Sequence, residues 1–180
     1  MIVNLFGVPG AGKSTGAAYI FSELKMRGVN CELITEYAKD KVWEDNKAVF
    51  DNQLYMFSKQ YYRITRCYDK VSCIITDSPL LLSLIYNKNK TIFKEHFDNL
   101  VLHIANSYKT MNYLIDRVKP YNPVGRHQSE DESNKLKLPI TKLLESNGIE
   151  YTVYSGTKEN YHKIADEVYS VIDYNLMPAK

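Results

Sequence analysis

A Gly-rich segment near the start of the sequence constrains the fold more than any other part of it. Residues 7–15 read GVPGAGKST and contain the complete pattern G-x-x-x-x-G-K-[ST], which binds phosphate groups when it joins a strand to a helix. Residues 2–6 form a short apolar run that predicts a strand, and residues 15–26 carry apolar side chains at helical spacing. The sequence therefore predicts a strand, a phosphate-binding loop and a helix in this order.

The residue types in this loop indicate how it would bind a nucleotide. Glycines let the backbone come close to the phosphates, and the N–H groups of the loop and of the following helix face the anion. We expect the Lys13 ammonium to contact the β- and γ-phosphates of ATP and the Ser14 hydroxyl to bind Mg²⁺. The predicted nucleotide-binding residues of the loop are Gly7, Pro9, Gly10, Ala11, Gly12, Lys13, Ser14 and Thr15.

Strand and helix patterns alternate along the rest of the chain. This alternation predicts a parallel sheet with helices on both faces. Residues 130–147 are predicted to form a helix that is kinked at Pro139. The predicted strands after the first are residues 31–35, 71–77, 111–115 and 151–154.

Length, charge and cysteine content limit the class of protein. The length of 180 residues fits one domain, which we assign to residues 1–180. The net charge of +2 is too small to argue for nucleic-acid binding from bulk electrostatics. The three cysteines show no metal or disulfide spacing, and no apolar run is long enough to span a membrane. We therefore expect a cytoplasmic protein, and the sequence leaves its oligomeric state open.

Two acidic residues follow predicted strands. Glu36 comes after the second strand, and Asp77 ends the third. Because ligands bind at the carboxyl edge of a parallel sheet, we expect both acids at the active site, Glu36 next to the substrate. Asp77 is in the position of a Walker B acid, which holds Mg²⁺ directly or through water. The alternatives are a solvated loop carboxylate for Glu36 and a helix cap for Asp77, because Ser78-Pro79 is typical of a helix start.

Aromatic and amide side chains indicate where an acceptor would bind. A helix predicted over residues 50–68 carries amides and aromatic rings, and Tyr37 directly follows the acid after the second strand. An amide can read the edge of a planar base while aromatic rings stack on its faces. The alternative is a packed helix with exposed amides. The predicted substrate residues are Glu36, Tyr37, Gln53, Phe57 and Tyr61.

The segment after the fourth predicted strand has a different composition. Residues 116–128 are basic and contain two prolines and a glycine. We expect residues 117–138 to form a lid over the phosphates, with Arg126 acting on the transferring charge. Arg117 could stack on the adenine or reach a phosphate. The alternative is an ordinary solvated loop.

The segments described above, taken in their order along the chain, resemble those of the P-loop kinases of the nucleoside and nucleotide kinase superfamily. The likeness covers nearly the whole chain. It extends to the nicotinamide riboside kinase domain of the bifunctional bacterial NAD regulator and to small AAA-type P-loop proteins of tailed phages. A phage source would place the protein in the host cytoplasm. The segments that carry the likeness are the loop, TEYA at 35–38, the Gln53-containing helix, TDSP at 76–79 and Gly125-Arg126.

The resemblance implies a fold, a phosphoryl donor and residue roles. The implied fold is a P-loop NTPase three-layer sandwich with a five-stranded parallel sheet of order 2-3-1-4-5. The donor would be Mg-ATP and the acceptor a hydroxyl group. By position, Glu36 matches the general base, Asp77 the acid that ends the third strand, and Arg126 the lid arginine. Gly156 follows the fifth strand, where many such kinases hold the adenine ring.

Three functions remain open at this point. The first is phosphorylation of a hydroxyl on a nucleoside- or nucleotide-like molecule. The second has a hydroxymethylated pyrimidine in phage DNA as the acceptor. Deoxynucleoside kinases have acid-Arg-Ser where this chain has Asp77-Ser78-Pro79, so the resemblance does not identify the acceptor. The third is a regulatory NTPase, although a GTPase is disfavoured because the guanine-binding Asn-Lys-x-Asp is absent.

Overall fold

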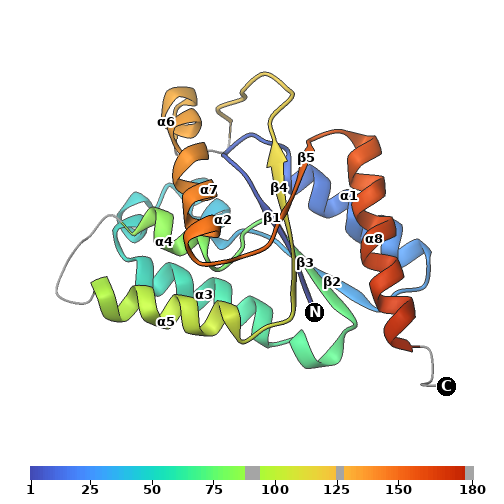
Figure 1. Cartoon of the computed structure of the whole chain (residues 1–180). Helices are drawn as coiled ribbons and strands as arrows, with labels where there is room; N and C mark the ends of the chain where they lie inside the picture. Colours follow the sequence, from blue (N-terminus) through green and yellow to red (C-terminus); the bar gives the residue numbers. More distant parts are fainter. Residues whose placement is uncertain (88–93, 125–127, 177–180) are drawn as a thin grey trace.

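The computed structural model describes residues 1–87, 94–124 and 128–176 (Figure 1). Five parallel strands form one sheet of order β2-β3-β1-β4-β5, which confirms the predicted topology. Each strand overlaps a segment that the sequence predicted as a strand. The strands are β1 (Ile2–Phe6), β2 (Cys31–Ile34), β3 (Cys73–Thr76), β4 (Thr110–Asp116) and β5 (Thr152–Ser155).

Helices cover both faces of the sheet and complete the three layers. Helices α1 and α8 pack together on one face, and α3, α4, α5 and α7 lie on the other (Figure 1). No helix in the described part of the chain has the length and apolar character needed to cross a membrane. The α-helices are α1 (Lys13–Met26), α2 (Tyr37–Trp43), α3 (Gln53–Thr65), α4 (Leu82–Tyr86), α5 (Lys94–Asn106), α6 (Glu130–Lys135), α7 (Lys137–Ser146) and α8 (Lys158–Leu176).

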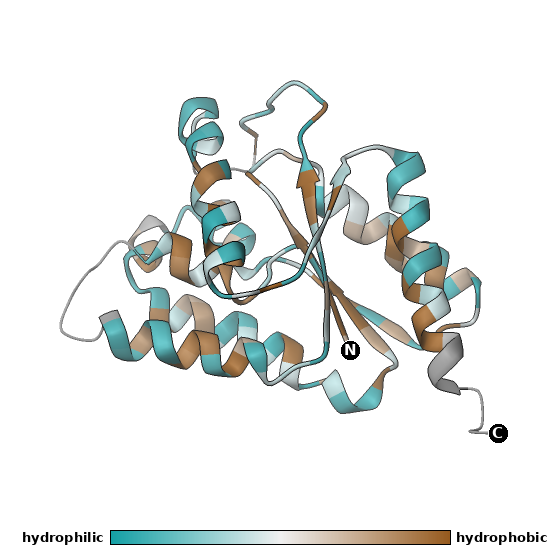
Figure 2. Ribbon diagram, in the orientation of Figure 1, coloured by the Kyte–Doolittle hydropathy of each residue, from teal (hydrophilic) through white to brown (hydrophobic). Residues whose placement is uncertain are grey.

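The central strands β1 and β3 are buried along their whole length, as expected for a parallel sheet that is covered on both faces. Figure 2 shows the hydrophobic residues gathered along these strands and on the sides of the helices that face them. The register pairs Asn4 with Thr76 and Phe6 with Leu114. The loops that follow β1, β3 and β4 therefore leave the sheet at the same edge.

Helix α2 was not predicted from the sequence. The helix covers Tyr37–Trp43 and buries none of its residues, so it has no apolar periodicity to detect. Polar contacts with α3 hold it instead. The backbone N–H of Tyr37 donates to Gln60 Oε1 at 2.9 Å, and the Arg63 guanidinium pairs with Asp40.

Two other helices begin or end where the sequence did not predict. The segment predicted as one helix kinked at Pro139 is two helices that meet at Leu136. Pro139 lies in the first turn of α7, where the backbone N–H has no intrahelical partner to lose. The helix predicted over 50–68 is α3 with a short 3₁₀ helix on each side, at Lys47–Asp51 and Tyr68–Lys70. Residues 87–90, whose sequence NKNK predicts a turn, lie mostly outside the described residues.

Candidate active site

The phosphate-binding loop joins β1 to α1 and has the backbone that the glycines predict. Gly12, which precedes α1, has a φ of 95°, in the region that favours glycine. A side-chain carbon on Gly7 would lie 2.6 Å from the Ile115 carbonyl oxygen, so β4 leaves no room for one. The loop is therefore pressed against the sheet edge, and the first turn of α1 points its N–H groups over it.

Lys13 bends back over this loop. Its Nζ donates to the carbonyl oxygens of Gly7 at 2.8 Å and Val8 at 3.1 Å. Ser14 and Thr15 are exposed in the first turn of α1. The ammonium and the two hydroxyl groups are therefore presented on the same side of the loop, as binding of a triphosphate requires.

Tyr161 of α8 supports the loop, and the sequence did not predict this role. Its hydroxyl donates to the Gly12 carbonyl oxygen at 3.0 Å, and its ring packs on Gly16 in α1. Burial raises the pKa of Tyr161, so the hydroxyl remains a donor. Gly16 was a signal for this contact in the sequence, since a glycine inside a helix often marks the close approach of another element.

This packing predicts that Gly16→Ala destabilises the protein, although alanine normally stabilises a helix by about 1 kcal/mol relative to glycine. The new methyl group would overlap the Tyr161 ring. We expect the free energy of unfolding, measured by urea denaturation, to fall by about 1–3 kcal/mol. Ser22→Ala, at an exposed position of the same helix, is the control. The loss should shrink in a Tyr161→Leu background, and an equal loss there would contradict the explanation.

Asp77 lies directly after β3 and is buried, with 3% of its surface exposed. Its Oδ1 accepts a hydrogen bond of 3.0 Å from the backbone N–H of Glu36. It does not cap the next helix, because α4 begins at Leu82 with Leu81 in the capping position. The predicted helix start at Pro79 is therefore wrong. Asp77 instead joins the ends of β3 and β2 beside the phosphate-binding loop.

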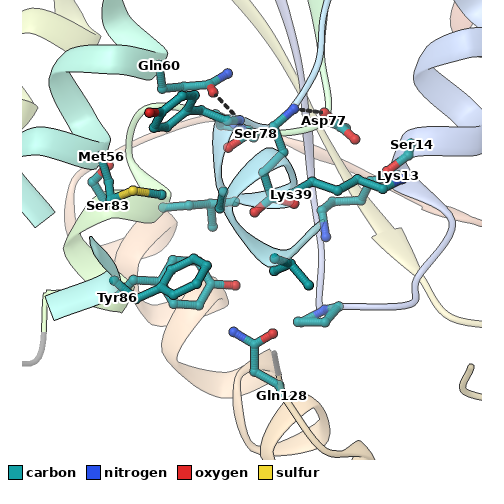
Figure 3. Close-up of a pocket in the computed structure, with 18 of the residues that line it drawn as sticks. Lys13, Ser14, Lys39, Met56, Gln60, Asp77, Ser78, Ser83, Tyr86 and Gln128 are labelled. Atoms are coloured by element: carbon teal, nitrogen blue, oxygen red, sulfur yellow. Dashed lines mark hydrogen bonds between the residues drawn. The ribbon is translucent and has the colours of Figure 1, made fainter. Parts of the chain in front are cut away.

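A cleft of about 260 Å³ opens between this loop and the helices α2, α3 and α4 (Figure 3). Glu36 and Asp77 both line it, so the structure brings the two predicted acids to the loop. Figure 3 shows Lys13, Ser14 and Asp77 on one side of the cleft and Met56, Ser83 and Tyr86 on the other. The loop residues that line the cleft are Pro9, Gly10, Gly12, Lys13, Ser14 and Thr15.

The wall opposite the loop is apolar with a few polar groups. Tyr86 is in this wall, where burial and the negative charge of Glu36 both raise the pKa of its hydroxyl. Tyr37 and Gln53 also line the cleft, as predicted for substrate residues. Gln53 Nε2 donates to the Phe50 carbonyl oxygen at 2.9 Å, which fixes the amide. The remaining members of the wall include Val42, Met56, Leu82, Ser83 and Gln128.

Phe57 and Tyr61 are not in this cleft, which corrects their assignment as substrate residues. Phe57 is 2% exposed, and its ring stacks on Tyr61 with 5.9 Å between ring centroids. The edge of Phe97 meets Phe57 from α5. These rings belong to the packing between α3 and α5. Their neighbour Gln60 is also occupied, since it holds the first turn of α2.

The described part of the lid is bonded to the loop. The buried Ser133 hydroxyl of α6 donates to the Pro9 carbonyl oxygen at 2.8 Å. Arg117 bonds to Asn134 and pairs with Glu130 at 3.4 Å, and its guanidinium lies 5.3 Å from the Tyr121 ring centroid. These contacts hold α6 next to the loop. Arg126 lies outside the described residues.

The other predicted nucleotide-binding residues lie away from the cleft. Gly7 and Arg117 line a second hollow of about 330 Å³ behind the loop. Gly156 is buried against the loop, because a side-chain carbon there would lie 2.5 Å from the Ala11 carbonyl oxygen. Ala11 is itself buried, at 3% exposed. Ala11 and Gly156 therefore shape the backbone of the loop, and their place beside a nucleotide stays a prediction.

Comparison with known proteins identifies the family of this chain. The family model described as the AAA domain matches residues 2–160. The chain belongs to the AAA-domain family. No curated protein matches the sequence.

Solved structures share the fold of this AAA-domain protein. Deoxyadenosine kinase from M. mycoides, solved with the products dCMP and a flexible dCDP, is 20% identical with a TM-score of 0.58. That match covers 94% of this chain and 100% of the other. The protein APE1195 is 16% identical with a TM-score of 0.50, over 96% of each chain. The AAA-domain protein thus has the fold of P-loop nucleoside kinases, and the likeness to the riboside kinase domain in particular stays a prediction.

The cleft of the AAA-domain protein fits a magnesium-bound nucleotide. The Ser14 hydroxyl and the Asp77 carboxylate line it together, and both are oxygen ligands of the kind Mg²⁺ prefers. The described residues contain no group of three or more His, Cys, Asp or Glu side chains that could hold a metal. Two protein ligands are sufficient for Mg²⁺, which keeps several waters and binds the phosphates of its nucleotide.

Proposed function

We propose that this AAA-domain protein transfers the γ-phosphoryl group of ATP to a hydroxyl of a nucleoside- or nucleotide-like acceptor. One observation carries the proposal. The phosphate-binding loop, a partly apolar wall and Glu36 line the same cleft, and Glu36 is near enough to Tyr86 of that wall for its charge to act on the Tyr86 hydroxyl. A donor on the loop and an acceptor on the wall would therefore meet at a carboxylate. The family and the kinase fold support this reading.

Each group of the cleft has a role in this reaction. Lys13 binds the β- and γ-phosphates, and the loop N–H groups fix their position. Glu36 takes the proton of the acceptor hydroxyl, whose oxygen then forms a bond to the γ-phosphorus. Ser14 and Asp77 would hold Mg²⁺, which supplies positive charge to the phosphate oxygens. Arg126 remains the lid arginine expected from the sequence.

The wall of the cleft favours a small planar acceptor. Met56, Leu82 and Tyr86 offer apolar surface, and Gln53, Ser83 and Gln128 offer polar groups for a ring edge. A free nucleoside or mononucleotide fits this description.

Release of ADP that depends on the acceptor tests the function. The purified protein is incubated with radiolabelled ATP and Mg²⁺, together with ribosides, deoxynucleosides, mononucleotides or DNA that carries hydroxymethylated pyrimidines. We expect label to appear on a small nucleoside-like acceptor. If label appears only on the DNA, the acceptor is a hydroxymethylated pyrimidine in DNA and not a small nucleoside-like molecule. ATP hydrolysis that no acceptor increases would indicate a regulatory NTPase and contradict the proposal.

The proposed metal ligands predict a changed magnesium requirement. Asp77→Asn and Ser14→Ala should each raise the Mg²⁺ concentration that gives half-maximal turnover, because the first removes the negative charge of a carboxylate ligand and the second removes a hydroxyl ligand. The shift for Asp77→Asn should be smaller if a water lies between the carboxylate and the metal. A magnesium titration of ADP release measures both shifts. A titration of Asp77→Asn that matches the unmodified protein would remove Asp77 from the metal site.

A further inference from the structure

Lys39 is in the stretch 36–40, whose position after the second strand predicts a place near the substrate, but no motif gave Lys39 a role of its own. It lies in the first half of α2 and lines the cleft together with Lys13, Glu36 and Asp77 (Figure 3). Its side chain is exposed. Lys13 and Lys39 are the two lysines among the described lining residues, one on the loop and one on α2.

The contacts of α2 fix where Lys39 lies. The backbone N–H of Glu36, which precedes the helix, is held by Asp77 at 3.0 Å. The next N–H, that of Tyr37, is held by Gln60 at 2.9 Å. The start of α2 is therefore fixed by two buried side chains, one directly after β3 and one on α3. Glu36 and Lys39 are three residues apart, so they lie on the same side of the helix.

The other charged residues of α2 are paired, and Lys39 is not. Asp40 pairs with Arg63 of α3, and Lys41 pairs with Glu44 at the end of the helix. No ion pair or hydrogen bond joins Lys39 to another described residue. Asp40 and Lys41 thus pair with other residues of the protein, whereas the unpaired Lys39 lines the cleft. Lysine suits such a site because its charge is a compact point on a flexible stem.

We infer that Lys39 contacts the γ-phosphoryl group during transfer and neutralises its charge from the acceptor side. The inference rests on the proposed phosphoryl transfer. The acceptor oxygen forms a bond to the γ-phosphorus while the bond to the bridging oxygen of ATP breaks, and that electron pair leaves with ADP. The hydroxyl proton goes to Glu36. Negative charge spreads over the oxygens of the transferring group, where Lys39 on α2 would add its positive charge to that of Lys13 on the loop.

Charge-preserving and charge-removing variants test this role. Lys39→Met keeps the length of the side chain and removes its charge, and Lys39→Arg restores the charge. We expect Lys39→Met to lower kcat by about 10²-fold, as loss of one stabilising group on developing charge does. The KM for the acceptor and the affinity for ATP should change by less than about threefold. Lys39→Arg should recover most of kcat. Lys59→Met, at an exposed position of α3 outside the cleft, is the matched control.

Two results would overturn the inference. One is an unchanged kcat in Lys39→Met, and the other is a raised KM for the acceptor with kcat unchanged, which would make Lys39 a simple binding residue. Failure of the proposed function is a separate outcome, recognised when no acceptor raises ADP release by the unmodified protein. ATP hydrolysis then gives the readout, because water attacks the same phosphoryl group. Hydrolysis should fall about 10²-fold in Lys39→Met, and unchanged hydrolysis would contradict the role.

Discussion

Replacing Lys13 with alanine is expected to abolish phosphoryl transfer and leave the fold intact. Lys13 lies on the phosphate-binding loop, is not among the fully buried residues, and its ammonium bonds to two loop carbonyl oxygens. Without it, the charge that develops on the γ-phosphoryl group loses its nearest loop cation. Removing one cation from a transferring phosphoryl group costs about 10³-fold or more in kcat. Acceptor-dependent ADP release measures the loss, and thermal denaturation checks the fold.

Lys25→Ala is the control for this variant. Lys25 is exposed in the last turn of the same helix, so the substitution removes the same side chain and the same charge far from the loop. Its turnover should match that of the unmodified protein. Unchanged turnover in Lys13→Ala would instead show that the loop is not the donor site.

Replacing Glu36 with glutamine should lower kcat by roughly 10²–10⁴-fold with little change in ATP affinity. Glutamine keeps the size and polarity of the side chain but cannot take the acceptor proton. Glu36 borders the acceptor wall, near enough to Tyr86 for its charge to raise the pKa of that hydroxyl. Background ATP hydrolysis should remain, because it does not use the acceptor. Measuring transfer and hydrolysis in the same variant separates the two effects.

Glu32→Gln provides the comparison, since Glu32 is an exposed residue of β2 outside the cleft. It should leave both activities unchanged. If Glu36→Gln loses transfer and hydrolysis equally, Glu36 belongs to the metal or phosphate site. Asp77 then becomes the candidate for the general base.

Sequence patterns predicted the fold where a physical signal was strong. The Gly-rich loop identified β1 and α1, and the continuous apolar run of β3 marked a strand that is covered on both sides. The alternation of elements then allowed few topologies. Helix α2 gave no such signal, because it buries none of its residues and is held by polar contacts.

The acceptor side was harder to predict because one helix faces both the core and the cleft. Phe57 and its neighbour Met56 are about 100° apart around α3, and only Met56 lines the cleft. Periodicity identifies such a helix but not which aromatic side chain points to the ligand. The position of residues 36–40 after β2 predicted a place near the ligand, but no pattern distinguished Lys39 among them, since its proposed role depends on the pairing of the charges around it.

The bond between Tyr161 and Gly12 has a consequence for how the protein is made. It joins residues 149 positions apart, so the ribosome releases the phosphate-binding sequence long before it adds the tyrosine that supports the loop. Contacts of such separation form late, because closing a long chain segment costs entropy before the contact can compensate. During synthesis, the chain therefore contains the phosphate-binding loop before it contains the Tyr161 that supports the loop. We therefore expect the proposed ATP site to be complete only once α8 has been synthesised and has packed against α1.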